Sequence, residues 1–257
     1  MLPLFQLITK KKTIAKTLDS LIDQSLPLHG IVVVNNCSKD RTVDIVQEYQ
    51  EKRNGSTIHL VSEPKKGTGS ACNRGFAFAI EVLMANIVSR TDADTVPSNN
   101  WNEEIEKFFR LHPNKKLVSG PSYALRDESY LPRDKFLWPF VQTAFRIGNV
   151  AITHSLFTTK FALGHNMAIT ADAFKQVGGF PDSSIDQADE DVELSKRIYN
   201  YYGLRDMGYE SAIKVRHSTR RIRQLGYRGL VLYYWNPGVL PSQSRRIKMT
   251  GGEIDKR

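Results

Sequence analysis

Hydrophobic positions follow two alternating periods along the first hundred residues. The apolar run at 31–34, Ile-Val-Val-Val, has the composition of a strand buried on both faces. Ile14, Leu18 and Leu21 recur at the spacing of one helix face and predict a helix over 13–24. The same patterns predict strands over 4–9, 57–61 and 87–91 and helices over 40–52 and 70–84. This alternation predicts an α/β fold in which helices cover a mostly parallel sheet.

The pattern loses its regularity beyond residue 98. It still predicts helices over 101–112, over 171–177 and from about 191 onward, and a strand over 117–122. The aromatic stretch 123–163 follows neither period, and the tail 236–257 has few apolar residues and several arginines and lysines. We therefore expect one domain over 1–257, with a regular half (1–98), an irregular half (99–235) and a basic tail (236–257).

The composition narrows the class of protein and of partner. The 257 residues include 36 Lys and Arg against 27 Asp and Glu, a net charge of +9. A basic surface attracts nucleic acid, anionic lipid or phosphorylated substrates, but no recognised nucleic-acid motif accompanies the charge, so we expect no nucleic-acid partner. The two cysteines, Cys37 and Cys72, form no CxxC pair, which argues against a disulfide scaffold and suits a reducing compartment.

Location can also be predicted from the sequence. No run of about 18 apolar residues is present, so no membrane-spanning helix is expected. The short apolar start runs into three lysines, the reverse of the order in a signal peptide, which predicts a cytoplasmic protein. Arginines between 216 and 228, followed by the apolar stretch 230–235, suit peripheral contact with an anionic membrane face. Contact with a diphosphate, or burial in the core, would explain the same residues.

Polar residues that could carry chemistry follow the predicted strand 87–91, because ligands of such sheets bind beyond the carboxyl ends of the strands. Asp92 and Asp94 come directly after that strand. Two carboxylates at this spacing can present oxygens to one divalent cation and to a ribose hydroxyl, and Mg²⁺ is typically held by one or two carboxylates plus substrate phosphates. A solvated acidic turn explains an isolated Asp-x-Asp equally well, but the position after a buried strand favours the functional interpretation.

Two other loops of the regular half are also polar. Residues 35–42 lead into a predicted helix, where they could read a nucleobase and face phosphate, while Ser38 and Asp40 would equally serve as helix caps. Residues 64–75 combine lysines and glycines before the next helix, which suits either a phosphate site or a flexible loop. The sequence there is not a Walker A motif.

The irregular half contains an acidic cluster at 186–197 and a basic segment at 215–221. A general base needs a carboxylate close to the acceptor hydroxyl, although carboxylates at a helix start are also favoured by the helix dipole. His217 could complete a metal site or bind phosphate, although a lone histidine is more often structural.

Seven segments, taken in chain order, resemble those of a family 2 glycosyltransferase with the GT-A fold. They are 31–42, 66–75, 91–95, 164–169, 177–180, 190–197 and 215–221. The resemblance covers residues 4–225 and implies a Rossmann-like central sheet, a nucleotide-sugar-binding half over 1–98 and an irregular acceptor-side half over 99–235. It implies inverting transfer from a nucleotide sugar, here expected to be a UDP-sugar, to a saccharide, lipid-linked or other hydroxyl acceptor in cell envelope polysaccharide biosynthesis.

The resemblance also implies roles for individual residues. Asp191 matches the catalytic base, with Glu190 beside it, and Asp94, Asp92 and His217 match positions that hold Mg²⁺ or Mn²⁺. The implied nucleotide-sugar contacts are Thr9, Asn35, Ser38, Asp40, Lys66, Asn73, Asp92, Ala93, Asn166, Arg220 and Arg221.

Two departures from the family pattern keep other interpretations open. Residues 6–11 lack the usual Asn-Glu pair, and Asn35 replaces an aspartate that accepts the uracil N3–H, although its carbonyl oxygen can still accept that bond. A sugar-nucleotide-binding protein that has lost activity is therefore an alternative. A nucleotidyltransferase is another, but its glycine-rich signature should follow the first strand, where this chain has Thr9 and three lysines.

Overall fold

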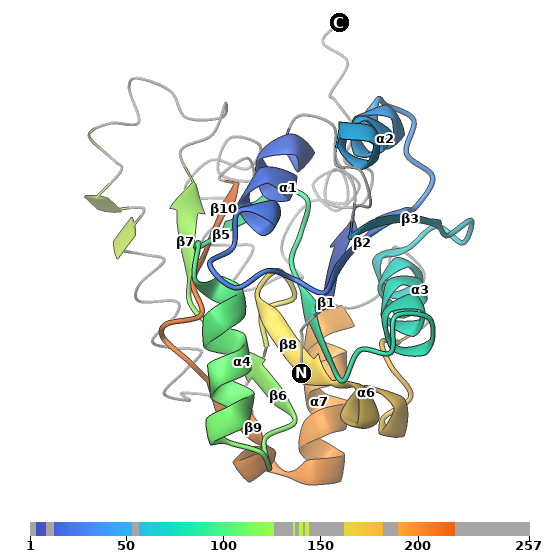
Figure 1. Cartoon of the computed structure of the whole chain (residues 1–257). Coiled ribbons are helices and arrows are strands. Elements are labelled where there is room, and N and C mark those ends of the chain that lie inside the picture. The colour runs from blue at the N-terminus through green and yellow to red at the C-terminus, as the bar shows by residue number, and fades with distance from the viewer. Residues whose placement is uncertain are drawn as a thin grey trace, which may run out of the picture.

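The regular first half folds as four parallel strands joined by helices (Figure 1). This computed structural model describes residues 4–8, 13–52, 57–125, 136, 139–140, 142–143, 162–181 and 190–218. The elements of this half are β1 (Leu4–Ile8), α1 (Ile14–Ile22), β2 (Gly30–Asn35), α2 (Thr42–Lys52), β3 (Ile58–Ser62), α3 (Thr68–Glu81) and β4 (Ile87–Arg90). Every strand and helix predicted for this half is confirmed, with boundaries that move by a few residues.

The second half contains several short strands. Its elements are β5 (Thr95–Pro97), α4 (Trp101–Leu111), β6 (Leu117–Ser119), β7 (Ser122–Leu125), β8 (Met167–Thr170), α6 (Ala171–Gln176), α7 (Glu190–Tyr202), the 3₁₀ helix η2 (Leu204–Asp206), β9 (Met207–Tyr209) and β10 (Val215–Ser218). The three predicted helices are confirmed as α4, α6 and α7. The single strand predicted over 117–122 is wrong, because Gly120 and Pro121 separate β6 from β7 and these strands belong to different sheets.

The strands form two sheets. The main sheet has the order β3-β2-β1-β4-β8-β6-β9, and the smaller one has the order β5-β10-β7. The first four strands of the main sheet are parallel, and β8 lies antiparallel between β4 and β6. In the small sheet, His217 of β10 pairs with Thr95 of β5. Since β5 follows β4 after four residues, this pairing brings β10 to the loop at the carboxyl end of β4.

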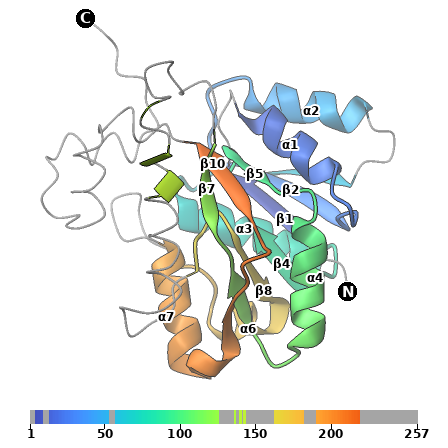
Figure 2. The same cartoon turned by 90° about the vertical axis from the view of Figure 1, so that its left-hand side faces the viewer.

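Alternate residues of β2 face two separate cores. Val32 and Val34 pack with residues of α3, α6 and α7, whereas Ile31 and Val33 pack with residues of α1, α2 and α4. Figure 2 shows the main sheet between these two groups of helices. Because both faces are covered, β2 reads as a continuous apolar run in the sequence. The carboxyl ends of the parallel strands leave an edge where the loops after β2, β3 and β4 gather.

Candidate functional site

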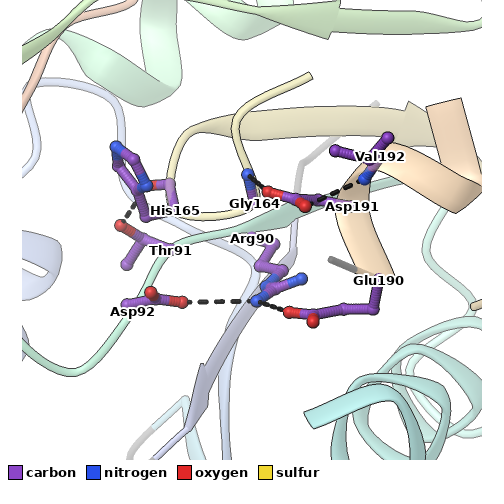
Figure 3. A network of polar contacts seen from close by, with 8 residues as sticks. All are labelled: Arg90, Thr91, Asp92, Gly164, His165, Glu190, Asp191 and Val192. Carbon is purple, nitrogen blue, oxygen red and sulfur yellow. Dashed lines mark hydrogen bonds and ion pairs between the residues drawn. The ribbon is translucent and has the colours of Figure 1, made fainter. Parts of the chain in front are cut away.

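The loop after β4 and the first turn of α7 meet at this edge, around the side chain of Arg90 (Figure 3). Arg90 is the last residue of β4, and its side chain is only 3% exposed. Its Nη2 lies 2.9 Å from Oε1 of Glu190 and 3.5 Å from Oδ1 of Asp92. Its guanidinium carbon lies 5.4 Å from the centre of the Phe180 ring, within reach of a cation–π interaction. Arg90 therefore joins two acidic motifs that are distant in the sequence.

The charge of Arg90 is stable in this environment. Burial by itself lowers the pKa of the guanidinium, but the acidic groups of Cys72, Glu190, Asp92 and Asp191 raise it, and together they place the pKa well above the usual value. Burial has the opposite consequence for the thiol of Cys72, because it disfavours the thiolate and raises the pKa. The site therefore contains a permanent cation between carboxylates, and a neutral thiol beside it.

Asp191 is held in a fixed orientation by two backbone groups. Its Oδ2 accepts a hydrogen bond from the N–H of Gly164 at 2.8 Å, and its Oδ1 accepts one from the N–H of Val192 at 2.9 Å. A Cβ atom added at Gly164 would lie 2.9 Å from Oδ2 of Asp191 and 3.0 Å from Nη1 of Arg90. Only glycine therefore lets the 164 loop approach both charged side chains so closely.

The backbone of the Asp92–Asp94 loop is anchored from both sides. The carbonyl oxygen of Ala93 accepts hydrogen bonds from the hydroxyls of Thr13, at 2.9 Å, and Thr17, at 3.1 Å. The carbonyl oxygen of Asp94 accepts one from the N–H of Ser218 at 3.0 Å. Ala93 thus fixes the loop through its backbone, while the carboxylate of Asp92 remains 38% exposed.

His217 lies next to this loop through its pairing with Thr95. Its Nδ1 is 3.2 Å from Oγ of Ser122, and its ring stacks on that of His165 with 4.8 Å between the centroids. The hydroxyl of Thr91 in turn donates to the carbonyl oxygen of His165 at 2.7 Å. Within the described ranges, however, no group of three or more His, Cys, Asp or Glu residues could hold a metal ion. Asp92, Asp94 and His217 therefore do not form a closed metal cluster by themselves.

The loops after β2 and β3 are joined by a residue that the sequence analysis did not single out. Asn36 donates through Nδ2 to the carbonyl oxygens of Glu63, at 2.9 Å, and Lys65, at 2.8 Å. Its Oδ1 accepts the N–H of Gly67 at 2.9 Å. These contacts bring the exposed Lys66 close to the start of the loop at 35–42.

The loop at 35–42 is organised by its own side chains. Asn35 accepts the N–H of Ser38 through Oδ1 at 3.0 Å. Asp40 accepts the first helical N–H of α2, that of Thr42, at 3.1 Å. The capping interpretation of Asp40 is therefore confirmed, and it leaves a contact with a nucleotide open.

Two other predicted donor contacts have a different position in the fold. Asn166 is fully buried and accepts the indole N–H of Trp101 at 2.8 Å, while its Nδ2 donates to the carbonyl oxygens of Pro121 and Ile213. Asn73 pairs with both backbone groups of Phe180. We leave both asparagines out of the proposed site, because their side chains hold distant segments together.

Some predictions fall on parts of the chain that lie outside the described residues. These are Thr9, Arg220, Arg221, the tail 236–257 and most of the stretch 123–163. Among the helices that are described, none has the length and hydropathy needed to cross a membrane. Contact with a membrane surface therefore stays a prediction.

The sequence analysis also missed Arg90, Gly164 and His165 as individual members of this cluster. For Arg90 a signal was present, since a charged residue ends the otherwise uncharged strand 87–90. For Gly164 and His165, no local pattern announces a contact with residues so far away in the chain.

The sequence matches known glycosyltransferases. The model of the family described as Glycosyl transferase family 2 matches residues 7–178. TuaG of Bacillus subtilis (strain 168), named as a teichuronic acid biosynthesis glycosyltransferase, is 30% identical over 142 residues, which cover 52% of this chain and 52% of TuaG. This chain spans about half the length of the curated relatives it matches.

Solved structures agree with this match. TarS 1-349 of S. aureus in complex with UDP-GlcNAc has a TM-score of 0.59 and 17% identity, covering 86% of this chain and 59% of that one. The mannosyltransferase PcManGT from Pyrobaculum calidifontis, in complex with GDP-Man and Mn2+, has a TM-score of 0.59 and 21% identity, covering 96% and 67%. These likenesses confirm the GT-A fold. Since the family model covers more than half of its length, the chain belongs to glycosyl transferase family 2.

Proposed function

We propose that this protein transfers a sugar from a nucleotide-diphosphate sugar to an acceptor hydroxyl, with inversion at the anomeric carbon. The meeting of two acidic motifs at the carboxyl edge of the parallel strands carries the proposal. Asp92 and Glu190 contact the same guanidinium, although Arg90 and Glu190 are 100 residues apart. The reaction needs a place for a diphosphate and a carboxylate near the acceptor hydroxyl, and this edge is suited to both.

Asp191 is the proposed general base. A base must lie within hydrogen-bond reach of the hydroxyl that it deprotonates, so a fixed carboxylate is favourable, and the N–H groups of Gly164 and Val192 provide that fixation. Asp191 would take the acceptor proton as the oxygen attacks opposite the leaving nucleoside diphosphate. Glu190 is engaged with Arg90 and is therefore the weaker candidate for the base.

Asp92 and Asp94 are the proposed protein ligands of Mg²⁺ or Mn²⁺. Their partly exposed loop supplies carboxylate oxygens, and such a set fits an ion that takes its remaining oxygens from substrate phosphates and water. His217 is the proposed additional ligand from β10, because Ser122 holds one ring nitrogen in the way that neighbours commonly orient metal-binding histidines. The ion would offset the charge that develops on the leaving diphosphate.

The donor class is proposed from the neighbours and from two loops of this chain. TarS and PcManGT are seen with UDP-GlcNAc and with GDP-Man. In this chain, Lys66 is exposed near the loop of Asn35, where it could meet phosphate. The carbonyl oxygen of Asn35 already accepts from Ser38, but its second lone pair could still accept a uracil N3–H. A UDP-sugar is therefore the first donor to test.

A saccharide or lipid-linked hydroxyl is the proposed acceptor. The name of TuaG places that relative in teichuronic acid biosynthesis, which suggests an envelope polysaccharide as the first acceptor class to test for this chain.

Thermal unfolding of the whole chain with nucleoside diphosphates, with and without Mn²⁺, tests the donor site. A ligand at about 100 times its Kd stabilises a protein by about 2.7 kcal/mol, so the preferred base should give the largest rise in Tm. We expect UDP with Mn²⁺ to give it. Release of sugar from the corresponding UDP-sugar would then distinguish a transferase from a protein that only binds. Absence of stabilisation by every nucleoside diphosphate would contradict the proposal.

A further inference from the structure

Arg90 is unusual for its burial. Among the buried residues that the structure describes, it is the only one with a formally charged side chain. It ends β4 at the centre of the main sheet, between β1 and β8. Its neighbours in the strand, Ile87, Val88 and Ser89, are buried and uncharged. A charged side chain at such a position needs a physical reason.

Stability alone does not supply that reason. Two of its nitrogens, Nε and Nη1, are buried without a hydrogen-bond partner in the described part of the chain. Each unpaired buried donor typically costs about 1–3 kcal/mol. Buried ion pairs are often no more stabilising than apolar side chains of similar volume. An apolar residue would therefore serve the core at least as well as this arginine.

The contacts of Arg90 suggest what the charge does instead. Nη2 bonds to Glu190, the first residue of α7, and also reaches Asp92 of the proposed donor loop. Nη1 lies beside Gly164, whose N–H holds the carboxylate of Asp191. The guanidinium is thus the one described group that contacts both acidic motifs and flanks the support of the proposed base (Figure 3).

We propose that Arg90 is a positioning residue for sugar transfer: by joining Glu190 of α7 to Asp92 of the donor loop, it keeps the carboxylate of Asp191 aligned with the bound donor. This inference rests on the proposed function. Arg90 acts through Glu190 and the 164 loop and does not itself react. Because misplacing a reacting group by about 1 Å can cost 10²-fold in rate, losing this joint should lower turnover far more than donor affinity.

Kinetics of Arg90→Met test the proposal, since methionine removes the charge and keeps an unbranched side chain. We expect kcat to fall about 10²-fold while the Kd for UDP with Mn²⁺, measured by calorimetry, changes by less than about threefold. Arg90→Lys retains the charge without the planar fork and should recover part of the rate. The matched control is Arg197→Met, farther along α7, where the arginine bonds to the carbonyl oxygen of Gly179 and should not affect kcat.

A second measurement does not depend on activity. Hydrogen exchange of the Gly164 amide reports its bond to Asp191, and we expect it to become at least about tenfold faster in Arg90→Met but not in Arg197→Met. If Arg90→Met does not fold, Arg90→Lys is measured in the same two ways and should show a smaller change in the same direction.

The outcomes separate the two proposals. Unchanged kcat in Arg90→Met, or a loss confined to nucleotide affinity, would overturn the positioning role. If the wild-type chain transfers or hydrolyses no nucleotide sugar, the proposed function fails. In that case faster exchange at Gly164 would still support the joint between β4 and α7, and unchanged exchange would overturn it.

Discussion

The two halves of the main sheet are assembled in different ways. In the donor half, β1, β2 and β3 pair in parallel with their neighbours in the chain, and one helix connects each strand to the next. In the other half, β8 runs antiparallel between β4 and β6, and β10 pairs with the distant strands β5 and β7. The donor loops are thus positioned by local β-α units, whereas the proposed base is positioned by contacts between distant segments. Substitutions in the two halves should fail differently.

The largest expected effect is that of Asp191→Asn, at the acceptor side. The amide keeps the shape of the carboxylate but cannot take a proton, so kcat should fall about 10³-fold, within the usual range for loss of a general base. The Kd for UDP with Mn²⁺ should be unchanged. Asp172→Asn, an exposed aspartate in the first turn of α6, is the control and should retain full activity. Normal turnover of Asp191→Asn would move the base to another carboxylate.

Asn166→Ala should weaken the junction between the halves without touching the chemistry. It removes one acceptor for Trp101 and two donors for the carbonyl oxygens of Pro121 and Ile213, all in a buried setting. We expect about 3 kcal/mol less free energy of unfolding in urea, since each unpaired buried group costs about 1–3 kcal/mol. The control is Asn100→Ala, which removes a longer contact with Glu104. Equal stability of the two variants would show that Asn166 does not hold the segments together.

Asp94→Ala should act on the donor half alone. We expect at least about tenfold weaker UDP affinity in Mn²⁺, equivalent to about 1.4 kcal/mol. Thermal stability without ligand should change by about 0.5 kcal/mol or less, as is usual for a loop substitution. Calorimetry with and without Mn²⁺ measures the effect, and Asp23→Ala, at the end of α1, is the control. Unchanged Mn²⁺-dependent affinity would exclude Asp94 as a ligand.

The smallest expected effect concerns Cys37, which follows Asn36 in the loop after β2. Cys37 is exposed, whereas Cys72 is buried and burial raises the pKa of its thiol, so maleimide at pH 7 should label Cys37 alone. Saturating UDP with Mn²⁺ should slow this labelling several-fold. Asp94→Ala should lose the protection. A labelling rate that UDP does not change in the wild-type chain would place the nucleotide away from this loop.

The sequence by itself determined the donor half and the family. Each parallel strand there is covered on both faces, so β2 appears as an unbroken apolar run, and each helix shows its own period. The acidic loop after β4 could be located for the same reason, because its strand is recognisable and ligands bind beyond strand ends.

Only the tertiary structure decided the other half. β5, β8, β9 and β10 have three or four residues each, too few to show a period, and they form because a distant strand supplies their hydrogen bonds. The sequence suggested Asn166 and Asn73 as donor contacts, but their amides satisfy buried backbone groups instead. Arg90 shows the same limit, since its contact with Glu190 crosses 100 residues. Local patterns report which residues are buried, whereas the partner of a buried polar group is chosen by the packing of the whole chain.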